Sequence, residues 1–197
     1  MIGNSRTQPE PKVVLVGDSG VGKTAIIQNF ITGILGQQTE PTVIATSFKT
    51  EIELEDGIKE EISIWDTAGQ ERFQSLIPLY LRNARGLILV ADITAKNNIQ
   101  TLDTIYMSLT DLDPTCICIL AANKIDLDLK KDISDLEKWA NDHHFSFTTV
   151  SAKTGSGIRE LFVKIAKLMR ETTPDQNYFN SKTTLREDPT KKNFPCC

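Results

Sequence analysis

The chain has 197 residues, of which 40% are hydrophobic, and it carries a formal net charge of −4 at pH 7 with a pI near 5.3. This length and apolar content suit one sizeable core, so we expect a single folded domain. The acidic balance argues against a nucleic-acid-binding surface, and no apolar run approaches the ~18 residues that a membrane-spanning helix needs.

The first predicted elements are a strand over residues 12–17 and a helix over residues 23–32, joined by a glycine-rich segment. From Gly17 to Thr24 this segment follows the P-loop pattern, in the strand–loop–helix context that the motif requires. Its glycines let successive backbone N–H groups surround a phosphate. We expect Lys23 to reach the β- and γ-phosphates of a nucleotide and the Thr24 hydroxyl to bind Mg²⁺. The residues predicted to hold the phosphates are Asp18, Ser19, Gly20, Val21, Gly22, Lys23, Thr24 and Ala25.

A turn-rich segment over residues 33–44 comes next, and Thr42 within it is a candidate for a second hydroxyl ligand to Mg²⁺. The alternative for Thr42 is an ordinary loop threonine. Strands are then predicted over residues 45–55 and 58–65, with a tight turn at Glu55-Asp56-Gly57 between them. This pair predicts one antiparallel hairpin in the sheet.

The segment Asp66-Thr67-Ala68-Gly69-Gln70 follows the second hairpin strand. We expect Asp66 to hold Mg²⁺ through a water molecule, because Mg²⁺ keeps part of its hydration shell. The Gly69 N–H is expected to donate to the γ-phosphate, and Gln70 to orient the attacking water.

Helices and apolar strands alternate through the rest of the chain. The order predicted is helix 77–84, strand 86–92, helix 97–112, strand 116–122, helix 132–144, strand 146–150 and helix 156–171. Continuous apolar strands are typical of a parallel sheet that is covered on both faces. We therefore predict an α/β fold of the P-loop NTPase class. Its six-stranded sheet is mostly parallel, has one antiparallel strand, and is flanked by about five helices.

Two polar motifs follow the last two predicted strands. Asn123-Lys124-Ile125-Asp126 comes after the first, and Ser151-Ala152-Lys153 after the second. Ligands of such sheets bind at the carboxyl ends of the strands. The Asp126 carboxylate can accept hydrogen bonds from N1–H and the 2-amino group of guanine, whereas adenine offers neither donor. A backbone N–H of the second motif can meet the guanine O6. Asn123, Lys124, Asp126, Ser151, Ala152 and Lys153 are thus the predicted base-binding residues.

Together these motifs make residues 12–171 similar to the Ras superfamily of small GTPases, and the run from Trp65 to Phe73 most resembles the Rab family. The resemblance implies a monomeric G domain that binds GTP, hydrolyses it to GDP with Mg²⁺, and works in vesicle trafficking. It assigns catalysis to Gln70, Lys23 and Thr42. It also implies an activating protein, an exchange factor, effectors, and escort and GDP-dissociation-inhibitor proteins that handle a prenylated chain.

Outside this domain we expect a flexible N-terminus over residues 1–11 and a disordered tail over residues 172–197. The tail ends in Cys196-Cys197, which is similar to the Rab double-cysteine lipidation signal. Two lipid chains give stable anchoring, so we expect the protein in the cytosol and on the cytoplasmic face of an endomembrane. The alternative is a pair of idle thiols.

Two departures from the family pattern affect the expected switch regions. The run from Thr42 to Phe48 lacks a glycine and has one extra residue, so we expect an irregularity at residues 43–47. Residues 31–47 contain no aromatic side chain to cover the guanine, which predicts nucleotide exchange faster than is usual for the family. The alternative function is a GTP-binding scaffold that hardly hydrolyses. A P-loop kinase is a more distant alternative.

Overall fold

The structure is a computed structural model that describes residues 10–34, 42, 45–67, 76–109, 112–128 and 131–172. Most of the expected N-terminus and tail therefore lies outside the described residues. The strands are β1 (Lys12–Val16), β2 (Thr46–Glu53), β3 (Lys59–Asp66), β4 (Ala84–Asp92), β5 (Ile117–Asn123) and β6 (Ser146–Thr149). The helices are α1 (Lys23–Thr32), α2 (Ile77–Leu81), α3 (Asn98–Met107), α4 (Ser134–Asp142) and α5 (Ile158–Glu171).

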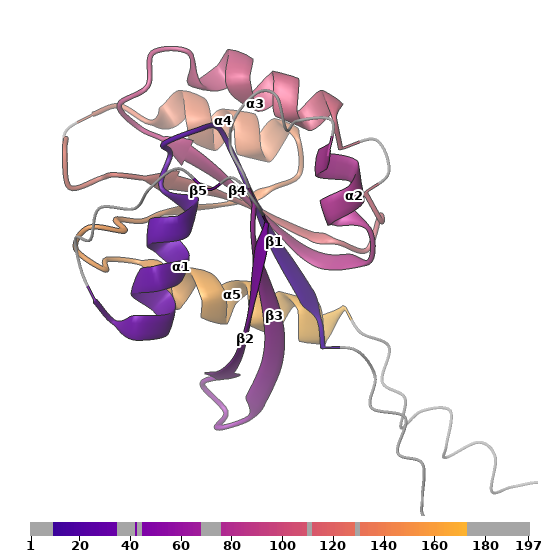
Figure 1. Ribbon diagram of the computed structural model, residues 1–197. Coiled ribbons are helices and arrows are strands. Elements are labelled where there is room, and N and C mark those ends of the chain that lie inside the picture. The colour runs from indigo at the N-terminus through magenta and orange to yellow at the C-terminus, as the bar shows by residue number, and fades with distance from the viewer. Residues whose placement is uncertain are drawn as a thin grey trace, which may run out of the picture.

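All six strands form one sheet, in the order β2-β3-β1-β4-β5-β6 (Figure 1). The β2–β3 pair is antiparallel, and every other pairing is parallel. This arrangement confirms the predicted fold class. The carboxyl ends of β1, β3, β4, β5 and β6 meet along one edge, where the predicted motifs follow the strands.

Helices cover both faces of the sheet, and the alternation of side chains along β1 shows why (Figure 1). Val13 and Leu15 belong to a fully buried cluster with α1 and α5. Val14 and Val16 point to the opposite face, where they pack in a second cluster with α2, α3 and α4. Phe162 on α5 is completely buried and stacks on Phe30 of α1, with the ring centroids 4.1 Å apart. Truncating a core aromatic of this kind typically costs ~3–5 kcal/mol.

Three predicted helices end earlier than expected, and the one predicted over residues 132–144 does so by two residues, at Asp142. The helix predicted over residues 77–84 ends at Leu81, because Asn83 takes a left-handed conformation with φ 61° and Ala84 already begins β4. Asparagine tolerates that conformation better than most residues. The helix predicted over residues 97–112 ends at Met107, where the Ser108 hydroxyl donates to the Ile105 carbonyl. Among the described residues, no helix is both long and apolar enough to cross a bilayer.

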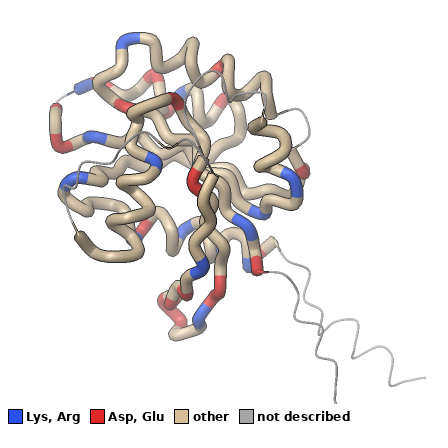
Figure 2. Tube along the Cα trace, viewed as in Figure 1, with Lys and Arg blue, Asp and Glu red and all other residues tan. Residues whose placement is uncertain are grey.

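The β2–β3 hairpin pairs without a register shift from Thr46 opposite Asp66 to Glu53 opposite Lys59. The expected irregularity is therefore wrong for residues 46 and 47, which belong to the regular ladder, while residues 43 and 44 lie outside the described residues. The predicted turn closes with the Leu54 N–H donating to the Ile58 carbonyl at 2.8 Å. Both signs of charge occur along this hairpin (Figure 2).

Candidate nucleotide-binding site

The P-loop lies between β1 and α1, and two of its glycines are required by close approaches. A Cβ on Gly17 would lie 2.4 Å from the Val90 carbonyl oxygen, where the loop crosses β4. A Cβ on Gly22 would lie 2.4 Å from the Asn123 side-chain nitrogen, and the φ of Gly22 is 101°. A side chain at either position would push the loop away from the sheet edge that carries the other motifs.

Lys23 lies under the P-loop and is only 5% exposed. Its Nζ donates to the carbonyl oxygens of Gly17 at 2.9 Å and Asp18 at 2.8 Å. Burial lowers the pKa of the Lys23 ammonium to about 8, although the charges of Asp66 and Asp18 act in the opposite direction. A phosphate beside this amine would favour its protonated form, because the opposite charges attract.

Thr24, Thr42 and Asp66 meet at one corner of the site. The Thr24 hydroxyl lies 2.7 Å from the Thr42 hydroxyl and donates to Asp66 Oδ2 at 2.7 Å. The Thr42 hydroxyl donates to the same carboxylate oxygen at 3.3 Å. Three segments that are distant in sequence thus converge on one carboxylate.

The Asp66 carboxylate is 3% exposed, and its Oδ1 atom has no hydrogen-bond partner among the described residues. Burial raises the pKa of Asp66, against the hydrogen bond from Thr24 and the charge of Lys23. A buried carboxylate oxygen without a partner is costly unless a cation or a bound water completes it. Two hydroxyls and a carboxylate are hard oxygen donors of the kind that Mg²⁺ prefers, so the residues present fit this ion.

Asn123 ties the two loops of the site together. It is 1% exposed, its Nδ2 donates to the Val21 carbonyl at 2.8 Å, and its Oδ1 accepts from the Ala152 N–H at 3.0 Å. The Ala152 carbonyl in turn accepts from the Asn29 side chain on α1 at 3.1 Å. The end of β5 therefore holds the P-loop and the Ser151–Lys153 loop in one relative position.

Asp126 is held in place by the loop that follows β6. Its Oδ1 accepts from the Ser151 hydroxyl at 2.6 Å, and its Oδ2 lies 3.8 Å from the Lys153 ammonium. Ser151 is fully buried, whereas the Lys153 side chain is 68% exposed. These contacts set the direction of the Asp126 carboxylate.

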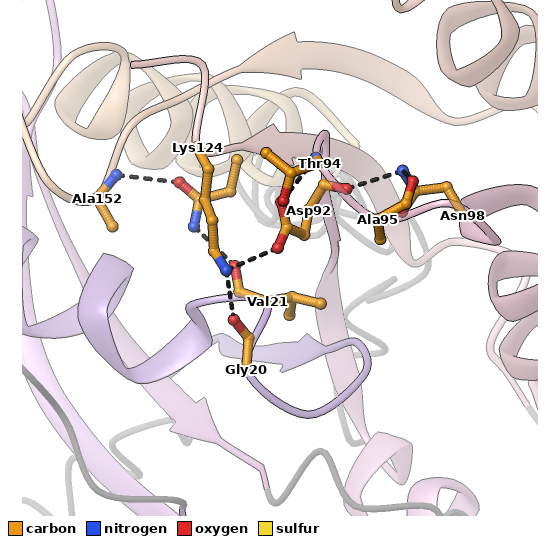
Figure 3. A network of polar contacts seen from close by, with 9 residues as sticks. Gly20, Val21, Asp92, Thr94, Ala95, Asn98, Lys124 and Ala152 are labelled. Carbon is orange, nitrogen blue, oxygen red and sulfur yellow. Dashed lines mark hydrogen bonds and ion pairs between the residues drawn. The ribbon is translucent and has the colours of Figure 1, made fainter. Parts of the chain in front are cut away.

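Sequence reasoning missed a residue that takes part in this arrangement, Asp92 at the end of β4. The Lys124 Nζ donates to Asp92 Oδ2 at 2.7 Å and to the Gly20 carbonyl at 2.8 Å (Figure 3). Burial acts to raise the pKa of Asp92, but hydrogen bonds from Lys124 and Thr94 outweigh it, so this pKa lies below its ordinary value. The sequence did offer one indication of this role, because Asp92 lies at the carboxyl end of an apolar strand, and ligands of such sheets bind at that edge.

Four predicted residues are not placed, because Gly69, Gln70, Cys196 and Cys197 lie outside the described residues. The others gather at the carboxyl edge of the sheet. The residues predicted to hold phosphate and metal lie around the start of α1, and the residues predicted to bind the base lie after β5 and β6. This combination of sheet order, P-loop and polar strand ends defines the class of nucleotide-binding G domains.

Comparisons with known proteins identify the family. A model of the Ras family matches residues 12–171, so the chain belongs to that family. The chain is similar to Ras-related protein Rab-5B of Plasmodium falciparum (isolate 3D7), with 35% identity over 86% of this chain and 83% of the relative. It is 34% identical to Ras-related protein Rab-22A of Mus musculus, over 95% of this chain and 98% of the relative. Identity to Ras-related protein Rab-26 of Bos taurus is 37%, over 81% of this chain and 64% of the relative.

The chain is therefore a Rab-like small GTPase, an enzyme that hydrolyses GTP and acts in vesicle trafficking. The predicted resemblance is confirmed. Neither the described part of the chain nor these relatives favour the alternative of a scaffold without hydrolysis.

Proposed function

We propose that GTP binds along the carboxyl edge of the sheet, with its phosphates on the P-loop and its base between Lys124, Asp126 and the Ser151–Lys153 loop. The observation that carries this proposal is the meeting of Thr24, Thr42 and Asp66 at 2.7–3.3 Å. Lys23 lies next to this corner, as its charge interaction with Asp66 indicates. The remaining phosphate contacts come from the N–H groups of Asp18, Ser19, Gly20, Val21, Gly22 and Ala25.

Mg²⁺ would be held directly by the hydroxyls of Thr24 and Thr42 and through a water by Asp66. When bound, Mg²⁺ would neutralise part of the negative charge that develops on the phosphates during hydrolysis. Thr42 reaches the corner from the segment that precedes β2, so it couples that segment to the bound phosphate. Loss of the γ-phosphate would weaken this coupling, which gives the protein two states for partners to distinguish.

For hydrolysis we assign Gln70 to orienting the attacking water and the Gly69 N–H to the γ-phosphate, while Lys23 neutralises phosphate charge. The sequence contains no motif that marks an arginine supplied in cis. We therefore expect slow intrinsic hydrolysis, on the order of 10⁻⁴ s⁻¹ as for Ras itself. An activating protein and an exchange factor would then set the lifetime of each state.

At the base, Asp126 would accept from guanine N1–H and the 2-amino group, and a backbone N–H of the Ser151–Lys153 loop would face O6. Asn123 acts behind these residues, because its hydrogen bonds hold Val21 and Ala152. Lys153 would complete the site from its exposed position. The G domain would span residues 12–171, between a flexible N-terminus over 1–11 and a disordered tail over 172–197.

The tail would carry prenyl groups on Cys196 and Cys197 and anchor a monomeric protein reversibly to the cytoplasmic face of an endomembrane. Two chains are needed for stable anchoring. Escort and GDP-dissociation-inhibitor proteins would shield these lipids in the cytosol, and effectors would bind the GTP state. Replacing both cysteines by serine should move the protein from membranes to the cytosol, with nucleotide binding unchanged. Membrane association that survives this change would contradict the lipid assignment.

The test of hydrolysis is a single-turnover assay with γ-labelled GTP and Mg²⁺, in which phosphate release and nucleotide dissociation are measured separately. We expect slow release from the wild-type chain and almost none from Gln70→Leu. Release at equal rates from both proteins would contradict the role of Gln70. Dissociation of intact GTP without release from either, even with candidate activators present, would favour the scaffold alternative.

A further inference from the structure

Lys124 adopts an uncommon backbone conformation, with φ 71°, directly after β5. A left-handed conformation costs a non-glycine residue roughly 1–2 kcal/mol, so the surrounding contacts must stabilise it. Its side chain makes two such contacts on other segments, with the Gly20 carbonyl at 2.8 Å and with Asp92 Oδ2 at 2.7 Å. Figure 3 shows Lys124 reaching from the end of β5 to both of them.

Asp92 is itself fixed by the end of its own strand. Its Oδ1 accepts from the Thr94 N–H at 2.8 Å and from the Thr94 hydroxyl at 2.7 Å. Its backbone carbonyl accepts from the Asn98 side chain at 2.8 Å (Figure 3). These bonds occupy one carboxylate oxygen and aim the other at Lys124. The Asp92 side chain is 14% exposed and that of Lys124 is 31% exposed, so solvent screens this ion pair less than an ordinary surface pair.

The contacts of Asn123 and Lys124 bear on the direction of the P-loop N–H groups. The carbonyl of one residue and the N–H of the next belong to a single planar trans peptide and point in opposite directions. Lys124 holds the Gly20 carbonyl, which fixes the N–H of Val21. Asn123 holds the Val21 carbonyl, which fixes the N–H of Gly22. Two successive donors of the phosphate cradle are thus aimed from behind by the base-recognition motif.

We propose that Asp92 is a positioning residue for nucleotide retention, which holds Lys124 on the Gly20 carbonyl and so couples the guanine-recognition loop to the phosphate cradle. This inference rests on the proposed nucleotide site. Asp92 would touch neither the phosphates nor the base. Its carboxylate keeps the Lys124 ammonium in a position that a neutral side chain would hold less firmly.

The test measures release of a fluorescent GDP analogue from the full chain, loaded in Mg²⁺ and chased with excess GDP. Asp92→Asn keeps the shape of the side chain and removes its charge. We expect release to become about tenfold faster, at the lower end of what a hydrogen bond between charged groups contributes. The matched control is Asp113→Asn. Asp113 accepts from the Thr115 N–H at 2.8 Å and its hydroxyl at 2.7 Å, the same local turn as at Asp92. Release from this control should equal that of the wild type.

A double-mutant cycle separates positioning from general destabilisation. Lys124→Met should also release GDP faster, and adding Asp92→Asn to it should bring no further increase, because Asp92 acts through Lys124. Effects that multiply in the double variant would overturn the inference. If Asp92→Asn does not fold, Thr94→Val gives a second test, since it loosens the Asp92 carboxylate and should raise release about two- to threefold.

Two negative outcomes have different meanings. Wild-type release from Asp92→Asn, together with fast release from Lys124→Met, overturns the inference and leaves the proposed site intact. Wild-type release from Lys124→Met as well overturns both the inference and the assignment of Lys124 to the nucleotide site.

Discussion

The two ends of the site differ in how completely the protein satisfies its own polar groups. At the end proposed to bind the base (the base end), the Asn123 side chain is paired on both of its polar atoms, and Asp126 is held by Ser151. At the end proposed to bind Mg²⁺ (the metal end), the buried Asp66 carboxylate has an oxygen without a partner among the described residues, and the Lys23 ammonium donates to loop carbonyls.

This difference indicates that the protein's own contacts organise the base end, whereas the metal end would be completed by a ligand. An organised site selects a ligand by rejecting whatever leaves its buried groups unpaired. A site with an unsatisfied carboxylate gains most from a cation. Changes at the base end should therefore alter which nucleotide is bound, and changes at the metal end should alter how binding depends on Mg²⁺.

The largest effect is expected from Asp126→Asn, which breaks selection at the base end. Ser151 donates to Asp126 Oδ1, so the amide nitrogen of the variant would replace the other oxygen. That nitrogen would face the 2-amino group of guanine, donor against donor, but would suit xanthine, which carries an oxygen at that position. The ratio of GDP affinity to xanthosine diphosphate affinity should fall about 10³-fold or more, measured by competition against a fluorescent nucleotide.

The control for this change is Asp135→Asn on the exposed first turn of α4, which should leave the ratio unaltered. An unchanged ratio in Asp126→Asn itself would show that the carboxylate does not read the base. Selection of the nucleotide would then not take place at the base end.

Removing Mg²⁺ tests whether the metal end retains the nucleotide. Chelation should make GDP release from the wild-type chain about 100-fold faster, as expected for a linked ion that was present at about 100 times its Kd. Thr24→Ala removes one of the hydroxyls that meet at Asp66, so its release in Mg²⁺ should already match the chelated wild type. Thr32→Ala, at the far end of the same helix, is the control and should respond to chelation as the wild type does. A full chelator response in Thr24→Ala would exclude Thr24 as a metal ligand.

The sequence predicted the motif residues of both ends because each motif is local. The P-loop and the segment from Asn123 to Asp126 are continuous runs beside apolar strands, so spacing alone locates them. The part played by Asp92 was not predictable in this way. Its partner Lys124 follows a different strand, and only the β4–β5 register, in which Asp92 lies opposite Asn123, brings the two side chains together.

Helix ends were the less predictable part of the fold. Leu109 and Leu112 continue the apolar spacing of α3 beyond Met107, so the pattern predicted a longer helix. The helix ends there because the Ser108 hydroxyl donates to the Ile105 carbonyl, and this local hydrogen bond competes with the hydrogen bonds of the helix. Leu109 is still buried, which explains why its apolar character resembled a helix position.

Asn123→Ala tests whether one side chain supports both the P-loop and the Ser151–Lys153 loop. The change leaves the Val21 carbonyl and the Ala152 N–H without their side-chain partner, at a cost of about 2 kcal/mol in the free energy of unfolding. We expect the melting temperature to fall by roughly 4–8 °C. Nucleotide release should also become faster, because both loops lose their common support. Faster release with an unchanged melting temperature would mean that Asn123 contacts the ligand rather than supporting the loops.

The smallest effect is expected from Thr67→Val, which tests whether the residue after Asp66 takes part in metal binding. Thr67 follows Asp66 directly, is 2% exposed, and donates from its hydroxyl to the Leu15 carbonyl at 2.6 Å. Valine keeps the shape and loses that bond, so the chain should lose about 1 kcal/mol of stability, or roughly 2–4 °C in melting temperature. Thr104→Val, on the exposed face of α3, should change neither quantity by more than a fraction of this.

GDP release from Thr67→Val with and without chelator shows whether Thr67 supports the fold or the metal site. If Thr67 only supports the fold, chelation should speed GDP release from the variant as much as from the wild type, because Leu15 lies in β1 and takes no part in the Thr24–Thr42–Asp66 corner. A weakened response would instead extend the metal end by one residue beyond Asp66. The organised part of the site would then be limited to the residues that follow β5 and β6, because the Thr67–Leu15 contact between β3 and β1 would itself depend on the bound ion.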